Sequence, residues 1–299
     1  EQNITMHSIS EVDQKLLESF DLIVVGNVVP KGSEHARLIE ESGVSFTSFP
    51  EVMGAFILES REVVGISGTH GKTTTTYLAL QVFEKLGLSP GYFVGGVLED
   101  RRSSQLGNDS LFIIEADEYD TAYFEKTSKF HHYSIDDLVI TSLEFDHGDI
   151  FASDQEIVSE FQKVAQTSRG VVIKNSDYPL VKEVVPGKVR KELTYGMLAT
   201  SGPQNITVSK NGRSKFEIVL GEQRATFETD VFGEHNILNL TVVIILAFEK
   251  GFSIDEIRKA VSELKLVRRR QEIVGTLNGA LVIDDFAHHP TAVEYTLRA

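Results

Sequence analysis

A glycine-rich stretch, Gly65-Ile66-Ser67-Gly68-Thr69-His70-Gly71-Lys72-Thr73, stands between two segments of different periodicity. Before it, Val63 and Val64 begin an apolar run that is typical of a buried strand. After it, residues 73–86 carry the spacing of a helix, which Gly87 ends. A glycine-rich turn between a strand and a helix is the setting of a phosphate-binding loop. The stretch therefore predicts an α/β domain with a nucleotide site.

The residue types of this loop fit a polyphosphate. Small residues allow successive backbone N–H groups to turn inward, and the start of the helix adds its dipole. Lys72 supplies a mobile positive charge, and the Thr73 hydroxyl can hold magnesium. The common pattern has glycine five positions before Gly71, where this sequence has Ile66. A glycine-rich turn with an exposed lysine is the alternative interpretation. The expected phosphate-binding residues are Gly68, Thr69, His70, Gly71, Lys72, Thr73 and Thr74.

Acidic residues follow two further apolar runs, 111–116 and 138–143. Both runs resemble central strands of a mostly parallel sheet, whose carboxyl ends share the edge where ligands bind. The acidic and imidazole side chains at these ends are Glu115, Asp117, Glu118, Glu144, Asp146, His147 and Asp149. Because Mg²⁺ keeps several waters, one or two carboxylates suffice, and Glu115 is the best candidate. His147 alone is as readily a helix cap or a surface histidine as a metal ligand.

The rest of the chain predicts two smaller α/β pieces and a β meander. Residues 21–47 alternate strand, helix and strand, beginning with a buried strand at 22–25. Between 205 and 232 the period changes to two, with turns at Asn211-Gly212 and Gly221-Glu222. A helix at 236–250, a hairpin at Asn278-Gly279 and a helix start at Pro290 follow. We expect an α/β fold in which a central P-loop domain with a mostly parallel sheet and an antiparallel meander lies between partial Rossmann-like domains.

These patterns suggest three domains. Residues 1–58 form a partial first domain, because no full strand or glycine-rich turn precedes the first unit. Residues 59–273 form the central nucleotide-binding domain, and 274–299 begin a third domain that is cut short. The oligomeric state does not follow from the sequence.

Composition excludes several classes of function. The formal net charge of −15 disfavours nucleic acid, which rewards clustered Lys and Arg. No apolar run has the length needed to cross a bilayer, so we expect no membrane partner. The absence of cysteine excludes disulfides, thiolate metal sites and cysteine nucleophiles, and it is consistent with a cytoplasmic protein.

Three weaker signals lie in the second half of the chain. Asn236 and Asn239 share one face of a helix start and could meet a flat heterocycle, although Asn there is usually a cap. Arg270 belongs to an arginine run that is either a solvated face or a phosphate contact. Asp285 could bond a ribose hydroxyl, or could join His288 and the histidine after it in a metal or acid/base cluster. Spacing alone does not choose between these possibilities.

The motifs, taken in order, resemble the Mur ligases, ADP-forming enzymes that build the peptide of bacterial peptidoglycan. The matching pieces are Gly-Thr-His-Gly-Lys-Thr-Thr-Thr at 68–75, Glu-Ala-Asp-Glu at 115–118, Asp146-His147, His-Asn-Ile-Leu-Asn at 235–239, Arg269-Arg270 and Asp-Asp-Phe-Ala-His-His-Pro at 284–290. The family's own loop is Gly-x-x-Gly-x-x-Gly-Lys-Thr, so Ile66 is no departure from it. The family has domains for the UDP-sugar, for ATP and for the incoming amino acid or peptide.

This resemblance implies a role for each matching residue. Lys72 would contact the β- and γ-phosphates of ATP, and Thr73 a magnesium ion, with Glu115 and His147 serving the metal sites. It further implies the adenine region for Asn236 and Asn239, the γ-phosphate for Arg270, the ribose for Asp285, and the junction of nucleotide and acceptor for His288. Lys72, Arg270 and His288 are the expected catalytic residues.

Within the family, residues 115–130 and 143–151 are most similar to the enzymes that join the murein tripeptide L-alanyl-γ-D-glutamyl-meso-diaminopimelate to UDP-N-acetylmuramate during peptidoglycan recycling. The resemblance implies that the carboxylate is activated as an acyl phosphate. The relatives that add L-alanine to the same UDP-sugar are the first alternative. A P-loop nucleotide hydrolase is the second, and a nucleotide-binding interaction module without enzymatic activity is the third.

Overall fold

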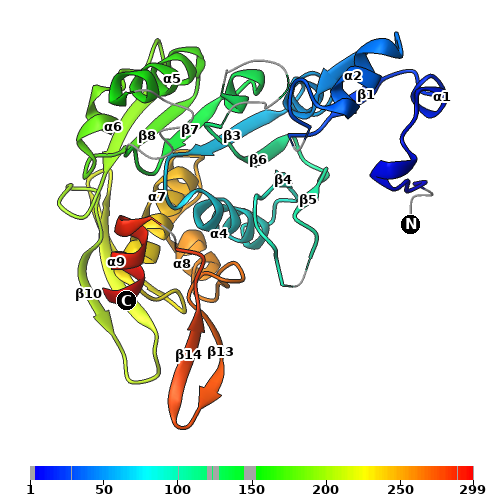
Figure 1. Ribbon diagram of the computed structural model, residues 1–299. Coiled ribbons are helices and arrows are strands. Elements are labelled where there is room, and N and C mark those ends of the chain that lie inside the picture. The colour runs from blue at the N-terminus through cyan, green and yellow to red at the C-terminus, as the bar shows by residue number, and fades with distance from the viewer. Residues whose placement is uncertain are drawn as a thin grey trace.

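The computed structural model describes residues 4–27, 29–99, 101–119, 123, 128–144, 153–287 and 289–298. Its centre is a seven-stranded sheet in the order β5-β4-β6-β3-β7-β8-β9 (Figure 1). All neighbouring strands are parallel except β5, which pairs with β4 in the antiparallel sense. The strands are β3 (Glu62–Ser67), β4 (Gly91–Phe93), β5 (Ser104–Gln105), β6 (Leu111–Glu115), β7 (Asp137–Ile140), β8 (Val171–Asn175) and β9 (Lys191–Tyr195).

The central strands are apolar because the sheet is covered on both faces. Successive residues of a strand point to opposite faces, and the buried residues divide accordingly. Val64 and Ile113 belong to one apolar cluster, whereas Val63, Phe112 and Ile114 belong to the other. The predicted sheet of central parallel strands is confirmed.

Helices cover each face of this sheet (Figure 1). The first cluster includes residues of α4 (Lys72–Lys85), α7 (Glu234–Glu249) and α8 (Ile254–Ala260). The second includes residues of α5 (Asp154–Thr167), α6 (Pro179–Glu183), the π-helix η2 (Met53–Leu58) and the 3-10 helix η3 (Lys129–His132). The nearly all-apolar α7 is explained by its position, since Val242 to Ala247 are all buried.

The predicted meander is a three-stranded antiparallel sheet of β10 (Gln204–Val208), β11 (Ser214–Leu220) and β12 (Gln223–Thr229). Its turns occur where the sequence predicts them, at Gly212 and Gly221, and both glycines have positive φ. Alternate residues of β11 are buried, and Phe216 and Phe227 join the first apolar cluster. The meander thus packs on the side of the central domain that carries α4, α7 and α8.

The N-terminal unit comprises η1 (Ile9–Glu11), α1 (Gln14–Leu17), β1 (Ile23–Val25), α2 (Glu34–Glu41), β2 (Phe46–Ser48) and α3 (Phe49–Val52). The predicted strand-helix-strand unit is confirmed, because β1 and β2 pair in parallel. The expectation that 22–25 is a buried strand is wrong: Leu22 is 41% exposed and Val24 43% exposed. Of this strand only Val25 is buried, since a two-stranded sheet covered by α2 shelters one face.

The C-terminal part begins with a hairpin of β13 (Glu272–Leu277) and β14 (Ala280–Asp284), which projects from the molecule (Figure 1). The predicted Asn278-Gly279 turn is confirmed, with φ of 51° and 83°, as a two-residue hairpin turn requires. Helix α9 (Pro290–Arg298) follows. No helix in the described part of the chain is both long and apolar enough to cross a membrane.

Candidate nucleotide and metal site

A cleft of about 390 Å³ lies where the central strands end. Glu115 is the last residue of β6, Thr141 follows β7, and Asn175 ends β8. The start of α7 and the segments around Arg270 and Asp285 close other sides of the cleft. The predicted phosphate-binding residues at 69–74 also line it. The structure therefore brings together, at one edge of the sheet, side chains that the sequence places far apart.

The phosphate loop is held in place by the segment after β7. The backbone N–H of Thr69 donates to the carbonyl of Ser142 at 3.2 Å, and that of His70 donates to the Ser142 hydroxyl at 2.7 Å. The Thr141 hydroxyl lies 2.6 Å from the carbonyl oxygen of His70 and donates to it. Gly68 has φ of +133°, and a Cβ there would lie 2.3 Å from Thr141 Oγ1. Glycine is therefore required where the loop meets β7.

Lys72 is the first residue of α4, and its ammonium group is buried against acidic side chains. Nζ donates to the Gly68 carbonyl at 2.7 Å and to both oxygens of Glu118, at 3.0 and 2.8 Å. Burial favours the neutral amine, but the charges of Glu118 and Asp117 outweigh it and raise the pKa of Lys72. The ammonium is thus charged, and in this conformation it is held by protein acceptors.

Thr73 and Glu115 form the predicted magnesium-binding pair. The Thr73 hydroxyl donates to Glu115 Oε1 at 3.0 Å, while Oε2 accepts from the backbone N–H of Gly95 at 2.8 Å. Cis oxygen ligands of an octahedral Mg²⁺ lie about 2.9 Å apart, because each sits about 2.0–2.1 Å from the ion. The spacing and the all-oxygen chemistry of this pair fit Mg²⁺. Both side chains line the cleft.

The two predicted asparagines differ in what they contact. Asn239 Oδ1 lies against Gly71, where a Cβ would approach it to 2.8 Å. Asn236 is buried, and its amide donates to the Phe232 carbonyl at 3.0 Å and to Gln271 Oε1 at 3.1 Å. Both residues line the cleft, and their adenine contacts stay predictions.

Arg270 and Asp285 lie together on the far side of the cleft. The Arg270 guanidinium lies 5.4 Å from the centre of the Phe286 ring. Asp285 accepts from the backbone N–H groups of Gln271 at 2.8 Å and of Ala287 at 2.7 Å, so its carboxylate fixes the local chain path. Burial lowers the pKa of the neighbouring His235, which Asp285 opposes and Arg270 reinforces. A neutral imidazole therefore faces the cleft near pH 7.

Two predicted site residues, His147 and His288, lie outside the described residues, as do Asp146 and Asp149. Helix α4 begins one residue before the predicted start, and β7 ends three residues before the predicted end of its run. The earlier end matters because Thr141 and Ser142 leave the ladder and become free to hold the phosphate loop.

Sequence reasoning missed the side of the cleft built by β8. Asn175, Asp177 and Tyr178 line the cleft, and Asn175 Nδ2 donates to the Thr141 carbonyl at 2.8 Å. A signal for them exists, since polar residues follow the apolar Val171–Ile173 run as acids follow the two earlier runs. The role of Glu118 as the partner of Lys72 was also missed.

Comparison with known proteins identifies the type of domain that carries this cleft. Residues 66–247 match the Mur ligase middle domain, which spans the phosphate loop, the strand-end carboxylates and α7. The chain belongs to the Mur ligase family. The family that the sequence resembles is therefore confirmed, and so is the α/β fold with a mostly parallel sheet.

Relatives within the Mur ligases carry two kinds of name. A Haemophilus influenzae protein named UDP-N-acetylmuramate–L-alanyl-γ-D-glutamyl-meso-2,6-diaminoheptandioate ligase is 36% identical over 93% of this chain. A Salinibacter ruber protein named UDP-N-acetylmuramate–L-alanine ligase is 33% identical over 93% of it. The chain spans 62% of the length of the first relative and 58% of the second.

A solved structure extends the likeness to three dimensions. The crystal structure of UDP-N-acetylmuramate:L-alanyl-γ-D-glutamyl-meso-diaminopimelate ligase from Neisseria meningitides superposes with a TM-score of 0.77. It is 32% identical, and the match covers 86% of this chain and 83% of that one. This Mur ligase likeness includes most of the described elements; the boundaries at 58 and 273 remain predictions.

Proposed function

We propose that this Mur ligase chain belongs to an ATP-dependent, ADP-forming enzyme that joins L-alanyl-γ-D-glutamyl-meso-diaminopimelate to UDP-N-acetylmuramate. The observation that carries the proposal is the placement of Lys72, Thr73 and Glu115 around one phosphate loop in one cleft. The names of the more similar relatives support the choice of substrates. A cytoplasmic location is part of the same proposal, because a chain without cysteine is consistent with a reducing compartment.

The reaction has two steps. The lactyl carboxylate of UDP-N-acetylmuramate attacks the γ-phosphorus of ATP, and the bond from this phosphorus to the β-phosphate oxygen breaks. The products of this step are an acyl phosphate and ADP. The amine of the tripeptide then attacks the acyl carbon, phosphate leaves, and the nitrogen loses a proton. Phosphoryl transfer asks the protein mainly for positioning and charge stabilisation.

The residues of the cleft supply these two contributions. Thr73 and Glu115 would hold Mg²⁺, which neutralises charge on the phosphate oxygens when bound. Lys72 and Arg270 bring positive charge to the same region, and the N–H groups of the loop orient the phosphates. We assign His288 to the junction of nucleotide and acceptor, and His147 to a metal site, on family resemblance alone.

The test is a coupled ADP-release assay on the full-length protein with ATP, Mg²⁺ and UDP-N-acetylmuramate. Tripeptide is compared with L-alanine as the acceptor. The proposal expects repeated turnover, with release of ADP and phosphate, only when both UDP-sugar and tripeptide are present. ADP release without UDP-sugar would indicate a nucleotide hydrolase, and AMP with pyrophosphate would exclude acyl-phosphate chemistry.

The L-alanine ligase activity is the second candidate, because relatives of that name also match most of the chain. Higher kcat/KM with L-alanine than with tripeptide would replace the first proposal by this one. Isothermal calorimetry adds a further check: a protein that binds ATP but not UDP-N-acetylmuramate would be a nucleotide-binding module.

A further inference from the structure

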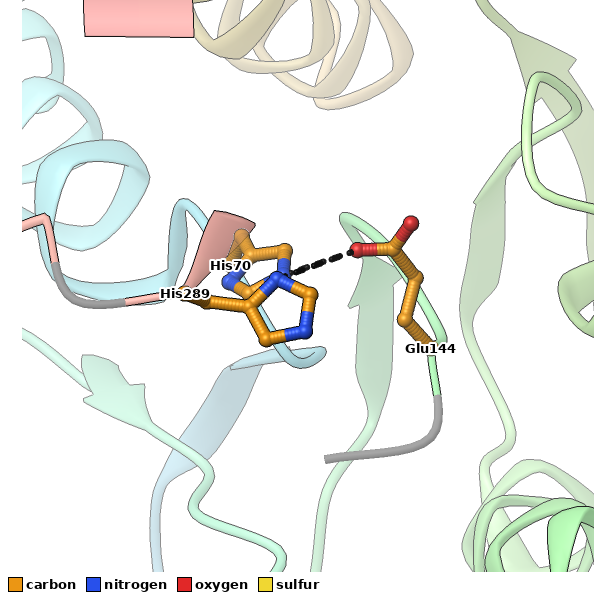
Figure 2. A group of neighbouring side chains, drawn as sticks. All are labelled: His70, Glu144 and His289. Carbon is orange, nitrogen blue, oxygen red and sulfur yellow. Dashed lines mark hydrogen bonds and ion pairs between the residues drawn. The ribbon is translucent and has the colours of Figure 1, made fainter. Parts of the chain in front are cut away.

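A cluster of two histidines and one glutamate lies beside the phosphate loop (Figure 2). His70 belongs to the loop, Glu144 follows β7, and His289 precedes α9. Each of the three residues offers one ligand atom, and these atoms all lie within 4.8 Å of one another. The two imidazole rings are inclined by 38° with their centroids 4.6 Å apart, and one nitrogen of each ring lies within 3.9 Å of Glu144 Oε2. Three separate segments of the chain therefore converge on one point.

The distances within this cluster are those of a set of metal ligands. His70 Nε2 lies 2.8 Å from Glu144 Oε2, and His289 Nδ1 lies 3.9 Å from the same oxygen. Ligands of a tetrahedral zinc ion lie roughly 3.4 Å apart, since each is about 2.0–2.2 Å from the metal. The two separations lie on either side of that value. Metal binding would move His70 Nε2 and Glu144 Oε2 apart and bring His289 Nδ1 closer to that oxygen.

A weak hydrogen bond identifies the unprotonated nitrogen of His289. The backbone N–H of Thr291 donates to His289 Nδ1 at 3.3 Å, so a metal ion bound to Nδ1 would take the lone pair that accepts this bond. At 3.9 Å from Glu144 the ring makes no hydrogen bond to the carboxylate. The Thr291 N–H and the His70 ring hold His289 beside the hydrogen-bonded His70–Glu144 pair, with no hydrogen bond from His289 to the carboxylate.

Glu144 is itself held by hydrogen bonds to other residues, as metal-binding side chains usually are. The Glu144 backbone N–H donates to Thr69 Oγ1 at 3.0 Å, and the Thr69 hydroxyl donates to the Glu144 carbonyl at 3.2 Å. Glu144 Oε1, the oxygen that does not face His70, accepts from the Thr291 hydroxyl at 3.3 Å. Contacts to two neighbouring segments therefore hold the carboxylate with Oε2 toward the imidazoles.

We propose that His70, Glu144 and His289 bind a transition-metal ion of the zinc class at a site separate from the predicted magnesium pair. Two imidazoles and one carboxylate suit Zn²⁺, whereas Mg²⁺ prefers oxygen ligands alone. His70 and His289 line the cleft, so the ion can enter, and a fourth position is open to water or to a bound group. This proposal does not depend on the proposed function.

Metal binding here has a structural consequence. The ion would join the phosphate loop to the segment that precedes α9, and these two segments are far apart in the sequence. The site thus couples metal occupancy to the position of the C-terminal segment.

The test measures Zn²⁺ binding to the metal-stripped full-length protein by competition with a chromophoric chelator. The proposal expects one equivalent of Zn²⁺, and binding at least about tenfold weaker in His289→Asn and in Glu144→Gln. Co²⁺ provides a second readout, because its visible absorption reports a low-coordinate site with nitrogen ligands; we expect this band to disappear in both variants. Thermal unfolding without metal checks that the variants fold.

Two control variants locate the ion. His131→Asn disrupts another half-buried His–Glu pair, in which His131 Nε2 lies 2.6 Å from Glu160, and it should leave zinc affinity unchanged. Glu115→Gln should also leave it unchanged, because it alters the magnesium pair. Zinc binding that survives His289→Asn but is lost in Glu115→Gln would overturn the proposal. So would the absence of stoichiometric zinc binding, which would reduce the cluster to a hydrogen-bonded group.

Discussion

Two buried lysines occupy opposite ends of the central sheet and use similar ion pairs for different purposes. Lys72 lies at the carboxyl ends of the strands, with Nζ 2.8 Å from Glu118. Lys250 follows α7 and reaches the opposite end, where Nζ is 2.6 Å from Asp137 at the start of β7 and 2.6 Å from Glu62 at the start of β3. Both lysine side chains are about 10% exposed.

The difference between the two lysines is in what surrounds them. Lys72 opens onto the cleft and has three protein acceptors that a phosphate can replace. Asp137, the partner of Lys250, also accepts from the backbone N–H of Val171 at 2.6 Å. Through these contacts and its pair with Glu62, Lys250 links the end of α7 to β3, β7 and β8. Equal burial and equal pairing therefore do not reveal function, whereas access to the cleft does.

Lys72→Ala is expected to have the largest effect. If the Lys72 ammonium contacts the phosphates as proposed, removing it should lower the rate of ADP release about a thousandfold or more. The matched control is Lys250→Ala, whose rate per folded molecule should stay within a few-fold of the parent protein. Near-normal turnover of Lys72→Ala would show that the loop does not carry the proposed chemistry.

Lys250→Ala is expected to act on stability. It leaves Asp137 buried without its cation, which should reduce the free energy of unfolding by about 3 kcal/mol in urea denaturation. Lys191→Ala removes a more exposed lysine from its pair with Glu249 and should cost less than about 1 kcal/mol. Equal losses in the two variants would mean that burial at the base of the sheet adds nothing to the pair.

Glu118→Gln is expected to have the smallest effect, and in the opposite direction. Glu118 holds Lys72, so weakening this bond should free the ammonium and tighten ATP binding about fivefold, measured by calorimetry with Mg²⁺. Glu118→Asp keeps the charge and serves as the control, with a smaller change expected. Weaker ATP binding in Glu118→Gln would show that Glu118 assists the nucleotide instead of competing with it.

Much of the fold could be predicted because its signals are local. Turn glycines at 212, 221 and 279 occur where the sequence indicates them. The exposure of Leu22 and Val24 could not be predicted this way, because an apolar strand looks the same whether one face is covered or two. Burial is a property of the assembled layers.

The contacts in the site likewise divide into those that the sequence predicts and those that depend on the assembled fold. Strand-end logic predicts that Glu115 meets Thr73, because adjacent parallel strands bring their ends together. It does not predict which of the neighbouring acids binds Lys72, since the backbone path beyond β6 decides whether Asp117 or Glu118 faces the ammonium. It also does not predict the contact between His70 and His289, which depends on where α9 docks.

The contact of Asn239 with Gly71 has a consequence for how the protein folds. The left-handed backbone of Gly71 begins α4, and the space beside it is filled by a side chain from α7, which is made much later in the chain. Contacts between residues so far apart in sequence raise the contact order of a domain, which on average slows its folding. A fragment that ends before α7 would contain the Gly71 motif without the side chain that fills the space beside it.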